Sequence, residues 1–296
     1  MRRNLSWVTF FVLLTTISLF FPLAPQAAKK SFVHPGLYQT KADLEFIKQK
    51  ILAGEQPWKD AARAIEILHA WSPNVWDFDY NDAKLLVRLT GHQFYNAAEI
   101  LRHTDSGWDQ RSIESFKRML LESLYPCIRY YYPEANGNWD GAIIQFVMAI
   151  AVFADNRPMF DHAVDHYLHG HANGNIFKYT YPNGQCQEST RDQGHVQLGL
   201  GEFAGAARIA QSQGVDLFSS GNNRLALGYE YTMRFLNGDS PFCYETISSR
   251  AKELSHACEA VYQQTHHGRC VPTCKKGWFG CSDIAEFCTR EICTAI

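Results

Sequence analysis

Blocks of basic residues are missing from this sequence. The formal net charge is −2 at pH 7, and no run of lysine or arginine provides the electrostatic footprint that nucleic-acid-binding proteins carry. A His-Glu-x-x-His metal motif is also missing, although His162 and His166 stand four residues apart. We therefore expect no nucleic-acid partner, and we expect these two histidines to lie on a solvated helix face rather than in a zinc site.

Strand-like alternation is scarce. Residues 176–181 alternate, but this segment is short and lies between turn residues. Apolar residues recur instead at helical spacing, which predicts helices over residues 44–52, 58–68, 82–90, 93–102, 112–125, 143–154, 157–168, 195–213 and 222–235. Residues 143–154 are apolar nearly all round, so we expect this helix to be buried on both sides. Such helices, joined by modest loops, predict an all-α fold, either an α/α toroid or an irregular bundle.

Cysteine is sparse in the first two thirds of the chain, where only Cys127 and Cys186 occur. The others are Cys243, Cys258, Cys270, Cys274, Cys281, Cys288 and Cys293. The crowding of cysteines from Cys270 to Cys293 predicts disulfides in an extracellular protein. The odd total of 9 leaves at least one thiol without an intrachain partner. The spacing of Cys270 and Cys274, with His266 nearby, matches no strong zinc template. We therefore expect neither a metal nor another cofactor.

The first residues are basic, Met1-Arg2-Arg3, and a mostly apolar run over residues 7–21 and small residues up to Ala28 follow them. This pattern is typical of a secretory signal peptide, and the run is short for a membrane span. We expect a signal peptide over residues 1–28, with an uncleaved anchor as the alternative. The rest is expected to be one secreted, monomeric domain over residues 29–268 with a Cys-rich tail over residues 269–296, and no membrane partner.

A run of polar side chains over residues 185–195 is the strongest functional feature of the sequence. Glu188, Arg191 and His195 recur at spacings of three and four, so a helix would place them on one face. An acid, a fixed cation and a group that exchanges protons near neutral pH would then form one patch. Such a patch suits the binding and deprotonation of an acidic substrate. The structural alternative is a helix start that Asp192 caps, with Arg191 paired to Glu188.

A second polar cluster spans residues 134–140, directly before the buried helix. Asparagine and glycine are ordinary turn residues, so a structural loop is the default interpretation. Trp139, however, offers an aromatic face for a sugar ring beside the amide of Asn138. Loops on a rigid helical scaffold are also where binding residues concentrate.

Several motifs, by their order and spacing, resemble the alginate lyase-like family of secreted polysaccharide lyases over residues 32–237. They are His34-Pro35-Gly36-Leu37, Asn136-Gly137-Asn138-Trp139, the run from Gln187 to His195, Gly214-Val215-Asp216-Leu217, and Asn223-Arg224-Leu225. The resemblance implies an α/α toroid, and β-elimination on an anionic polysaccharide, alginate or a related polyuronate.

The resemblance also implies roles for single residues. Asn138, with Asn136, and Arg191 would neutralise the substrate carboxylate. His195 would remove the proton next to that carboxylate, and Glu188 would orient Arg191 or His195. A tyrosine would protonate the leaving glycosidic oxygen. The candidates for this acid, in order of preference, are Tyr244, Tyr262 and Tyr181. The residues expected to contact the substrate are Asn136, Trp139, Gln193 and Tyr181.

Two departures from the family pattern matter. Trp139 follows Asn138 where alginate lyases of the best-known type carry a histidine, and for this reason the base role falls to His195. The Cys-rich end does not resemble the further helices with which the family continues, so we expect a truncated or altered version of the fold.

Two other functions stay open. The first is a glycoside hydrolase on a similar toroid, which would use paired carboxylates. The candidates for this pair are Asp140, Glu188 and Asp192. The second is a catalytically inactive protein that binds a polysaccharide.

Overall fold

The computed structural model describes residues 30–56, 64–75, 83–104, 107–132, 135, 137–171, 174–189 and 191–236. Apart from Lys30, these residues belong to one unit, Ser31–Ile296. Several sequence predictions lie outside the described residues, namely the signal peptide over residues 1–28, the tail over residues 269–296, Asn136, Tyr244 and Tyr262.

Helices account for the regular structure of the described residues. They are α2 (Lys41–Leu52), α4 (Ala64–Trp71), α5 (Ala83–Arg102), α6 (Gln110–Arg118), the π-helix η2 (Met119–Leu124), α7 (Tyr125–Ile128), α8 (Gly137–Phe153), α9 (Arg157–His169), α10 (Ile176–Tyr179), α11 (Gln193–Ser212) and α12 (Ser220–Leu236). The segment that alternates in the sequence, residues 176–181, forms α10 and one isolated bridge from Thr180 to Cys186. The all-α prediction is confirmed.

Side-chain caps define where several helices begin. Thr40 and Asp43 form a reciprocal capping box at the start of α2. Asp109, Asn156 and Asp192 each accept a hydrogen bond from a backbone N–H in the first turn of α6, α9 and α11. These caps satisfy backbone donors that a helix start leaves without a partner.

The prediction of two helices divided by Gly91 is wrong, because α5 continues through this residue. Gly91 lies where the backbone comes close to two buried rings. A Cβ atom here would stand 2.0 Å from the Tyr95 hydroxyl and 2.3 Å from the Phe146 ring. The glycine therefore allows close packing of α5 on α8 and does not end the helix.

Helices α5, α8 and α11 run in the same direction. Tyr95 packs edge-on against Phe146 at 4.6 Å, and further along both helices the guanidinium of Arg102 lies over the ring of Phe153. Between α8 and α11, a Cβ on Gly141 would meet the Phe203 ring, and a Cβ on Gly205 would meet the side chain of Gln145. In each pair, residues later in one helix contact residues later in the other, as parallel helices require.

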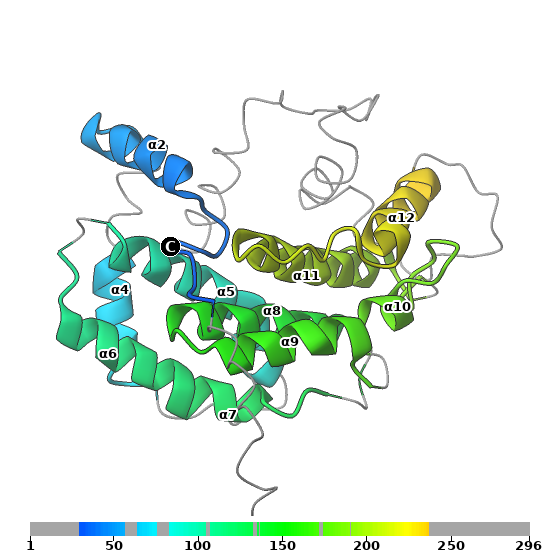
Figure 1. Cartoon of the computed structure of the whole chain (residues 1–296), viewed down its shortest axis with the longest axis horizontal. Coiled ribbons are helices and arrows are strands. Elements are labelled where there is room, and N and C mark those ends of the chain that lie inside the picture. The colour runs from blue at the N-terminus through cyan, green and yellow to red at the C-terminus, as the bar shows by residue number, and fades with distance from the viewer. Residues whose placement is uncertain are drawn as a thin grey trace, which may run out of the picture. The chain divides into compact units, whose positions relative to one another are not determined.

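The segment from α6 to α7 and the helix α9 run against α8. Phe116 in α6 packs on Phe153 at the end of α8, whereas the N–H of Tyr132, which follows α7, bonds to Asp140 near the start of α8. Helix α9 follows the end of α8 after three residues and brings His166 back to Asp140. Parallel inner helices with antiparallel outer helices are the pattern of an α/α toroid, which confirms the predicted fold class (Figure 1).

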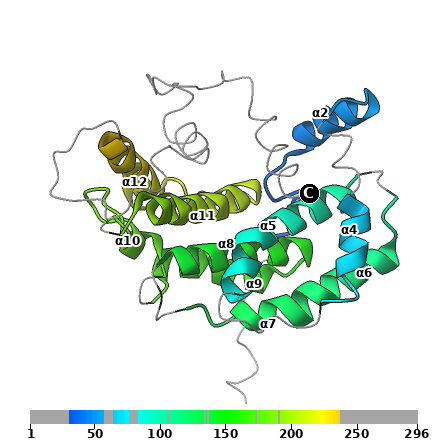
Figure 2. The same cartoon turned by 180° about the vertical axis from the view of Figure 1, so that it is seen from behind.

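Helix α8 forms the centre of the core. Of its residues, all except Trp139 are buried, which confirms the expectation of a helix covered on both sides. In both views α8 lies between α11 and the segment from α6 to α7 (Figures 1 and 2). Because α5, α8 and α11 are parallel, their N-terminal ends lie on one side of the helix layer and their C-terminal ends lie on the other.

Candidate active site

The two polar clusters of the sequence meet at the N-terminal end of the inner helices. The amide oxygen of Gln187 accepts a hydrogen bond of 2.8 Å from the N–H of Gly137, the first residue of α8. This bond joins the polar run before α11 to the start of α8, across 50 residues of sequence. The structure therefore brings together two clusters that the sequence offers separately.

His195 lies in the first turn of α11 and is held by the residue that caps this helix. One carboxylate oxygen of Asp192 accepts from the His195 backbone N–H at 2.9 Å, and the other lies 2.8 Å from Nδ1 of the imidazole. A carboxylate at this place keeps the proton on Nδ1, so Nε2 carries the free lone pair. The His195 side chain is 22% exposed, and Nε2 has no partner among the described residues. This arrangement can accept a proton from a bound substrate.

Tyr179 holds the first turn of α11 through its hydroxyl group. Its hydroxyl donates to the carbonyl oxygens of His195 and Val196 at 3.1 and 3.0 Å. Burial raises the pKa of Tyr179 well above its ordinary value, so the group stays a hydrogen-bond donor. Burial also raises the pKa of the nearby Cys186 thiol to about 12, which makes Cys186 an inert thiol.

Glu188 and Arg191 form an ion pair, but they do not share a helix with His195. Helix α11 begins at Gln193, and Glu188 lies in a turn before it. Nη1 of Arg191 stands 3.5 Å from Glu188, whose side chain is fully buried, whereas the Arg191 side chain is 50% exposed. Neither Glu188 oxygen makes a hydrogen bond within the described residues. Glu188 thus holds Arg191 at the surface, and Asp192 takes the orienting role toward His195.

Asn138 and Trp139 stand in the first turn of α8, where the sequence predicted a loop. Asn138 is 2% exposed, and its side-chain oxygen makes no hydrogen bond within the described residues. Trp139 is half-buried and packs against the ring of Tyr132 at 4.8 Å. Asn138 therefore adds a buried amide with an unsatisfied oxygen to the first turn of α8.

Asp140 and His166 form a buried pair that sequence reasoning missed. The Asp140 carboxylate accepts from the Tyr132 N–H at 2.8 Å and lies 3.2 Å from Nε2 of His166. The expectation of a solvated face is wrong for His166, which is 5% exposed and stacks on Tyr131, while His162 is exposed. His166 is buried because a buried carboxylate needs a partner.

The other predicted site residues divide between core and surface. Gln193 is buried in the first turn of α11, whereas the Tyr181 side chain is 40% exposed in the loop after α10. Tyr181 is therefore the one candidate acid that lies within the described residues, since Tyr244 and Tyr262 lie outside them.

Positive and negative groups both lie at the N-terminal end of the inner helices. The N-termini of α8 and α11 both lie here, and each carries the partial positive charge of a helix dipole. Arg191 adds a full positive charge that is half exposed. The neighbouring carboxylates of Asp140, Glu188 and Asp192 are buried, and they pair with His166, Arg191 and His195 respectively. Among the described residues, the grouping of His and Glu side chains able to share a metal ion lies elsewhere, around His34.

Fold and site together show a helical toroid with a half-exposed arginine and a carboxylate-bonded histidine at the start of one inner helix. The sequence profile of the alginate lyase family matches residues 48–242, and the chain belongs to this family. A solved structure of alginate lyase A1-III in complex with a tetrasaccharide is similar, with 14% identity and a TM-score of 0.49 over 67% of this chain. The chain spans 57% of the length of that protein. Among curated proteins, none matches the chain.

None of the described helices is both long and apolar enough to cross a bilayer. Cys127 and Cys186, the two cysteines within the described residues, form no disulfide. The cysteines from Cys243 onward lie outside the described residues, so their pairing stays a prediction.

Proposed function

We propose that this protein is a polysaccharide lyase that cleaves a uronic-acid polymer, alginate or a related polyuronate, by β-elimination. The observation that carries the proposal is the His195–Asp192 pair at the start of α11, next to the half-exposed guanidinium of Arg191. Membership of the alginate lyase family supports it.

Elimination needs a positive environment for the substrate carboxylate. The proton to be removed sits on the carbon next to this carboxylate, and its removal places a second negative charge on the group. Arg191 supplies a fixed cation, and Asn138 supplies an amide at the N-terminus of α8. Both would bind the carboxylate more strongly as charge develops, and this difference is what accelerates the reaction.

The proton then moves to Nε2 of His195. Asp192 stabilises the imidazolium that forms, because its carboxylate stays bonded to the Nδ1 hydrogen. The electron pair left on carbon forms the new double bond as the bond to the glycosidic oxygen breaks. This oxygen takes a proton from an acid. Tyr244 remains the preferred acid, with Tyr262 and Tyr181 after it, and Asn136, Trp139 and Gln193 are proposed to contact the neighbouring sugars.

A glycoside hydrolase is not favoured. That mechanism needs two carboxyl groups that reach the glycosidic bond and its attacking water. Asp140 and Asp192 are each 3% exposed and bonded to His166 and His195, and Glu188 is 0% exposed. All three carboxylates are paired, with His166, His195 and Arg191, so no pair of them is left to act on a glycosidic bond.

Purified protein incubated with mannuronate-, guluronate- and glucuronate-containing polymers tests the proposal. Elimination creates an unsaturated uronic end that absorbs ultraviolet light, and we expect this absorbance to rise with one of the polymers. His195→Ala should abolish the rise while polymer binding persists, and His169→Ala, which removes an exposed histidine from α9, should leave it unchanged. Polymer binding without turnover, equal in wild type and His195→Ala, would instead establish an inactive binding protein.

We further propose that the protein acts outside the cytoplasm, as the expected signal peptide over residues 1–28 implies. The basic start and the apolar run of the sequence support this location. N-terminal sequencing of protein recovered from the culture medium checks it, and an intact Met1 on secreted protein would contradict cleavage.

A further inference from the structure

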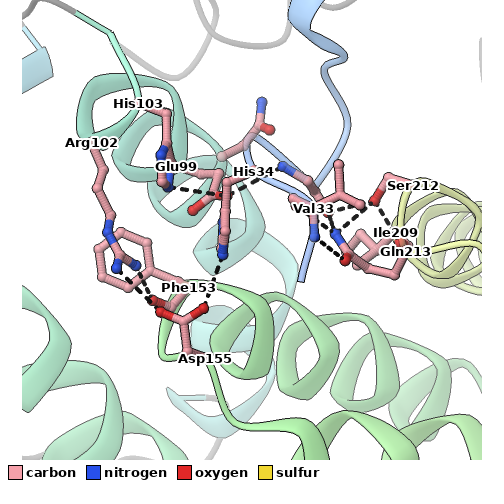
Figure 3. Close-up of polar contacts among 12 residues, drawn as sticks. Val33, His34, Glu99, Arg102, His103, Phe153, Asp155, Ile209, Ser212 and Gln213 are labelled. Atoms are coloured by element: carbon pink, nitrogen blue, oxygen red, sulfur yellow. Dashed lines mark hydrogen bonds and ion pairs between the residues drawn. The ribbon is translucent and has the colours of Figure 1, made fainter. Parts of the chain in front are cut away.

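A second cluster of titratable side chains lies at the C-terminal end of the inner helices, away from the candidate active site. His34 comes from the segment before α2, Glu99 from the last turn of α5, His103 from the turn that follows α5, and Asp155 from the turn after α8. Figure 3 shows these side chains converging between the three segments. The elimination reaction makes no use of them.

We propose that His34, Glu99 and His103 form a binding site for a divalent transition-metal ion, with zinc as the best fit. One ligand atom from each residue lies within 4.8 Å of the others. Two imidazole nitrogens and a carboxylate oxygen are a donor set that zinc favours, with a fourth position left for water.

The distance from Glu99 to each histidine is close to that required by one shared ion. Nδ1 of His34 lies 2.5 Å from Oε1 of Glu99, and Nε2 of His103 lies 3.7 Å from the same oxygen. Two ligands of a tetrahedral zinc ion stand about 3.3 Å apart. The distance between His34 and Glu99 therefore has to increase by less than about 1 Å. The distance between His103 and Glu99 has to decrease by a smaller amount. The rings of His34 and His103 are stacked, with centroids 4.5 Å apart and planes 17° apart, so one ring has to turn before both nitrogens point at one ion.

Glu99 carries an oxygen for which the protein offers no hydrogen bond. Its side chain is 1% exposed, and Oε2 is buried without a hydrogen-bond partner among the described residues, although Oε1 accepts from the Gly36 N–H at 3.2 Å. An unsatisfied oxygen of a buried carboxylate is costly. A metal ion at the cluster would satisfy it, either through direct binding or through its water.

Asp155 supplies the outer contact that histidine ligands of metals usually have. Its carboxylate lies 3.0 Å from Nε2 of His34, the ring nitrogen opposite to the proposed ligand atom. Arg102 in turn bonds to the other oxygen of Asp155 at 3.2 Å. A carboxylate–histidine–metal chain of this kind fixes the ring and raises its basicity. An ion pair of His34 with Glu99 alone would not require Asp155 at this position.

Protons compete with the metal at this cluster. Burial lowers the pKa of His34, but hydrogen bonds and charges of Glu99 and Asp155 outweigh burial and raise it. Burial lowers the pKa of His103, which favours the neutral ring that a metal ligand needs. An incoming ion has to take the place of the short contact between His34 Nδ1 and Glu99 Oε1.

The ion would secure the segment that precedes α2. This segment already bonds to the end of α11, where Gln213 accepts from the Val33 N–H at 2.9 Å and donates to the Gly36 carbonyl at 2.8 Å. A metal held by His34, Glu99 and His103 would strengthen the link that this segment already makes to α5 through Glu99. A metal ion that binds the folded state but not the unfolded state raises the melting temperature.

The test uses the full chain, stripped with a chelator and titrated with zinc chloride by calorimetry and thermal melting. We expect one ion bound with an increase in melting temperature in the wild type. In His103→Ala and His103→Gln we expect at least about 100-fold weaker binding at this site. These variants leave the His34–Glu99 pair in place, so metal-free melting should change little. His169→Ala is the matched control, with one exposed histidine fewer and unchanged binding.

The cysteines from Cys243 onward are a second source of zinc binding, and cobalt(II) separates the two. Cobalt on nitrogen and oxygen ligands lacks the strong ligand-to-metal absorption of thiolates. The proposal expects a cobalt spectrum without this absorption that disappears in His103→Ala. Metal uptake that is identical in wild type and His103→Ala, or no uptake at all, would overturn it.

Discussion

Asp192 serves two structural purposes with its two carboxylate oxygens. One oxygen caps α11 through the His195 N–H, and the other binds the His195 ring. The spacing is that of a capping box, in which the third helical residue turns its side chain back to the cap. A histidine at that place, three residues after an aspartate, is the pattern from which the pair can be predicted. The expected Asp192 cap and Arg191–Glu188 pair are also present, so helix-start geometry and the proposed base use the same residues.

Asp192→Asn should separate the two purposes. Asparagine caps a helix about as well as aspartate, but its amide NH₂ facing Nδ1 would favour the tautomer with the proton on Nε2. We expect kcat for elimination to fall by about 10²–10⁴-fold with little change in melting temperature. Asp192→Ala should lose the activity and also about 0.5–2 kcal/mol of stability. Full activity in Asp192→Asn would show that His195 is not oriented in this way.

Asp216, in the turn between α11 and α12, should make stability depend on pH in acid. The Ser219 hydroxyl, followed by the backbone N–H groups of Ser219 and Phe218, lowers the pKa of Asp216 despite some burial. A lowered folded-state pKa stabilises the protein above the unfolded pKa of about 3.9, and this stabilisation disappears as the pH falls through the folded value. Urea unfolding should therefore show a gap between wild type and Asp216→Ala at neutral pH that shrinks below about pH 4. A gap that grows in acid would contradict the assignment.

At the scale of the elements, periodicity predicts that helices exist better than it predicts where they begin. The apolar stretch of α8 is evident in the sequence, but its first turn contains Gly137, Asn138 and Asp140, which are typical of loops. The turn is helical because its surroundings hold it, through the bond from Gly137 to Gln187 and the pair of Asp140 with His166. Tertiary contacts of this kind are not visible in local sequence.

Gly91 and Gly201 make a matched test of close helix packing. Both lie inside helices, and alanine favours a helix interior by about 1 kcal/mol over glycine. A Cβ at Gly91 meets Tyr95 and Phe146, whereas a Cβ at Gly201 meets nothing within 4 Å. In chemical denaturation we expect Gly91→Ala to destabilise the protein by about 1–3 kcal/mol and Gly201→Ala to stabilise it by about 0.5–1 kcal/mol. A stabilised Gly91→Ala would mean that α5 and α8 are not closely packed here.

At the scale of the whole molecule, the parallel direction of α5, α8 and α11 decides which residues meet. It brings Gly137 to Gln187 at one end and His34 to Glu99 and Asp155 at the other. The fold class followed from helical spacing and from the family resemblance, and the fold confirms both. The meeting of His34 with Glu99 spans 65 residues, and no spacing rule within one helix predicts it. Glu99 and His103, four residues apart at the end of α5 and in the turn after it, are the part of the cluster that the sequence could have predicted.

The separation of the two ends has a consequence for function. The candidate active site and the proposed metal site use opposite ends of the same inner helices, so each can be altered without removal of the other. Loss of zinc binding in His103→Ala with intact elimination would be consistent with both proposals, because neither His103 nor His34 takes part in the proton transfer.

The most direct test of the central claim is the fate of the bond that is cleaved. A defined polyuronate oligomer is incubated with the protein in heavy-oxygen water, and the fragments are weighed by mass spectrometry. If the protein is a lyase, two fragments are expected whose masses add up to that of the substrate, one of them unsaturated, with no heavy oxygen incorporated and no cleavage by His195→Ala. Fragments whose masses add up to the substrate plus one water that carries the heavy oxygen would show hydrolysis and would contradict β-elimination.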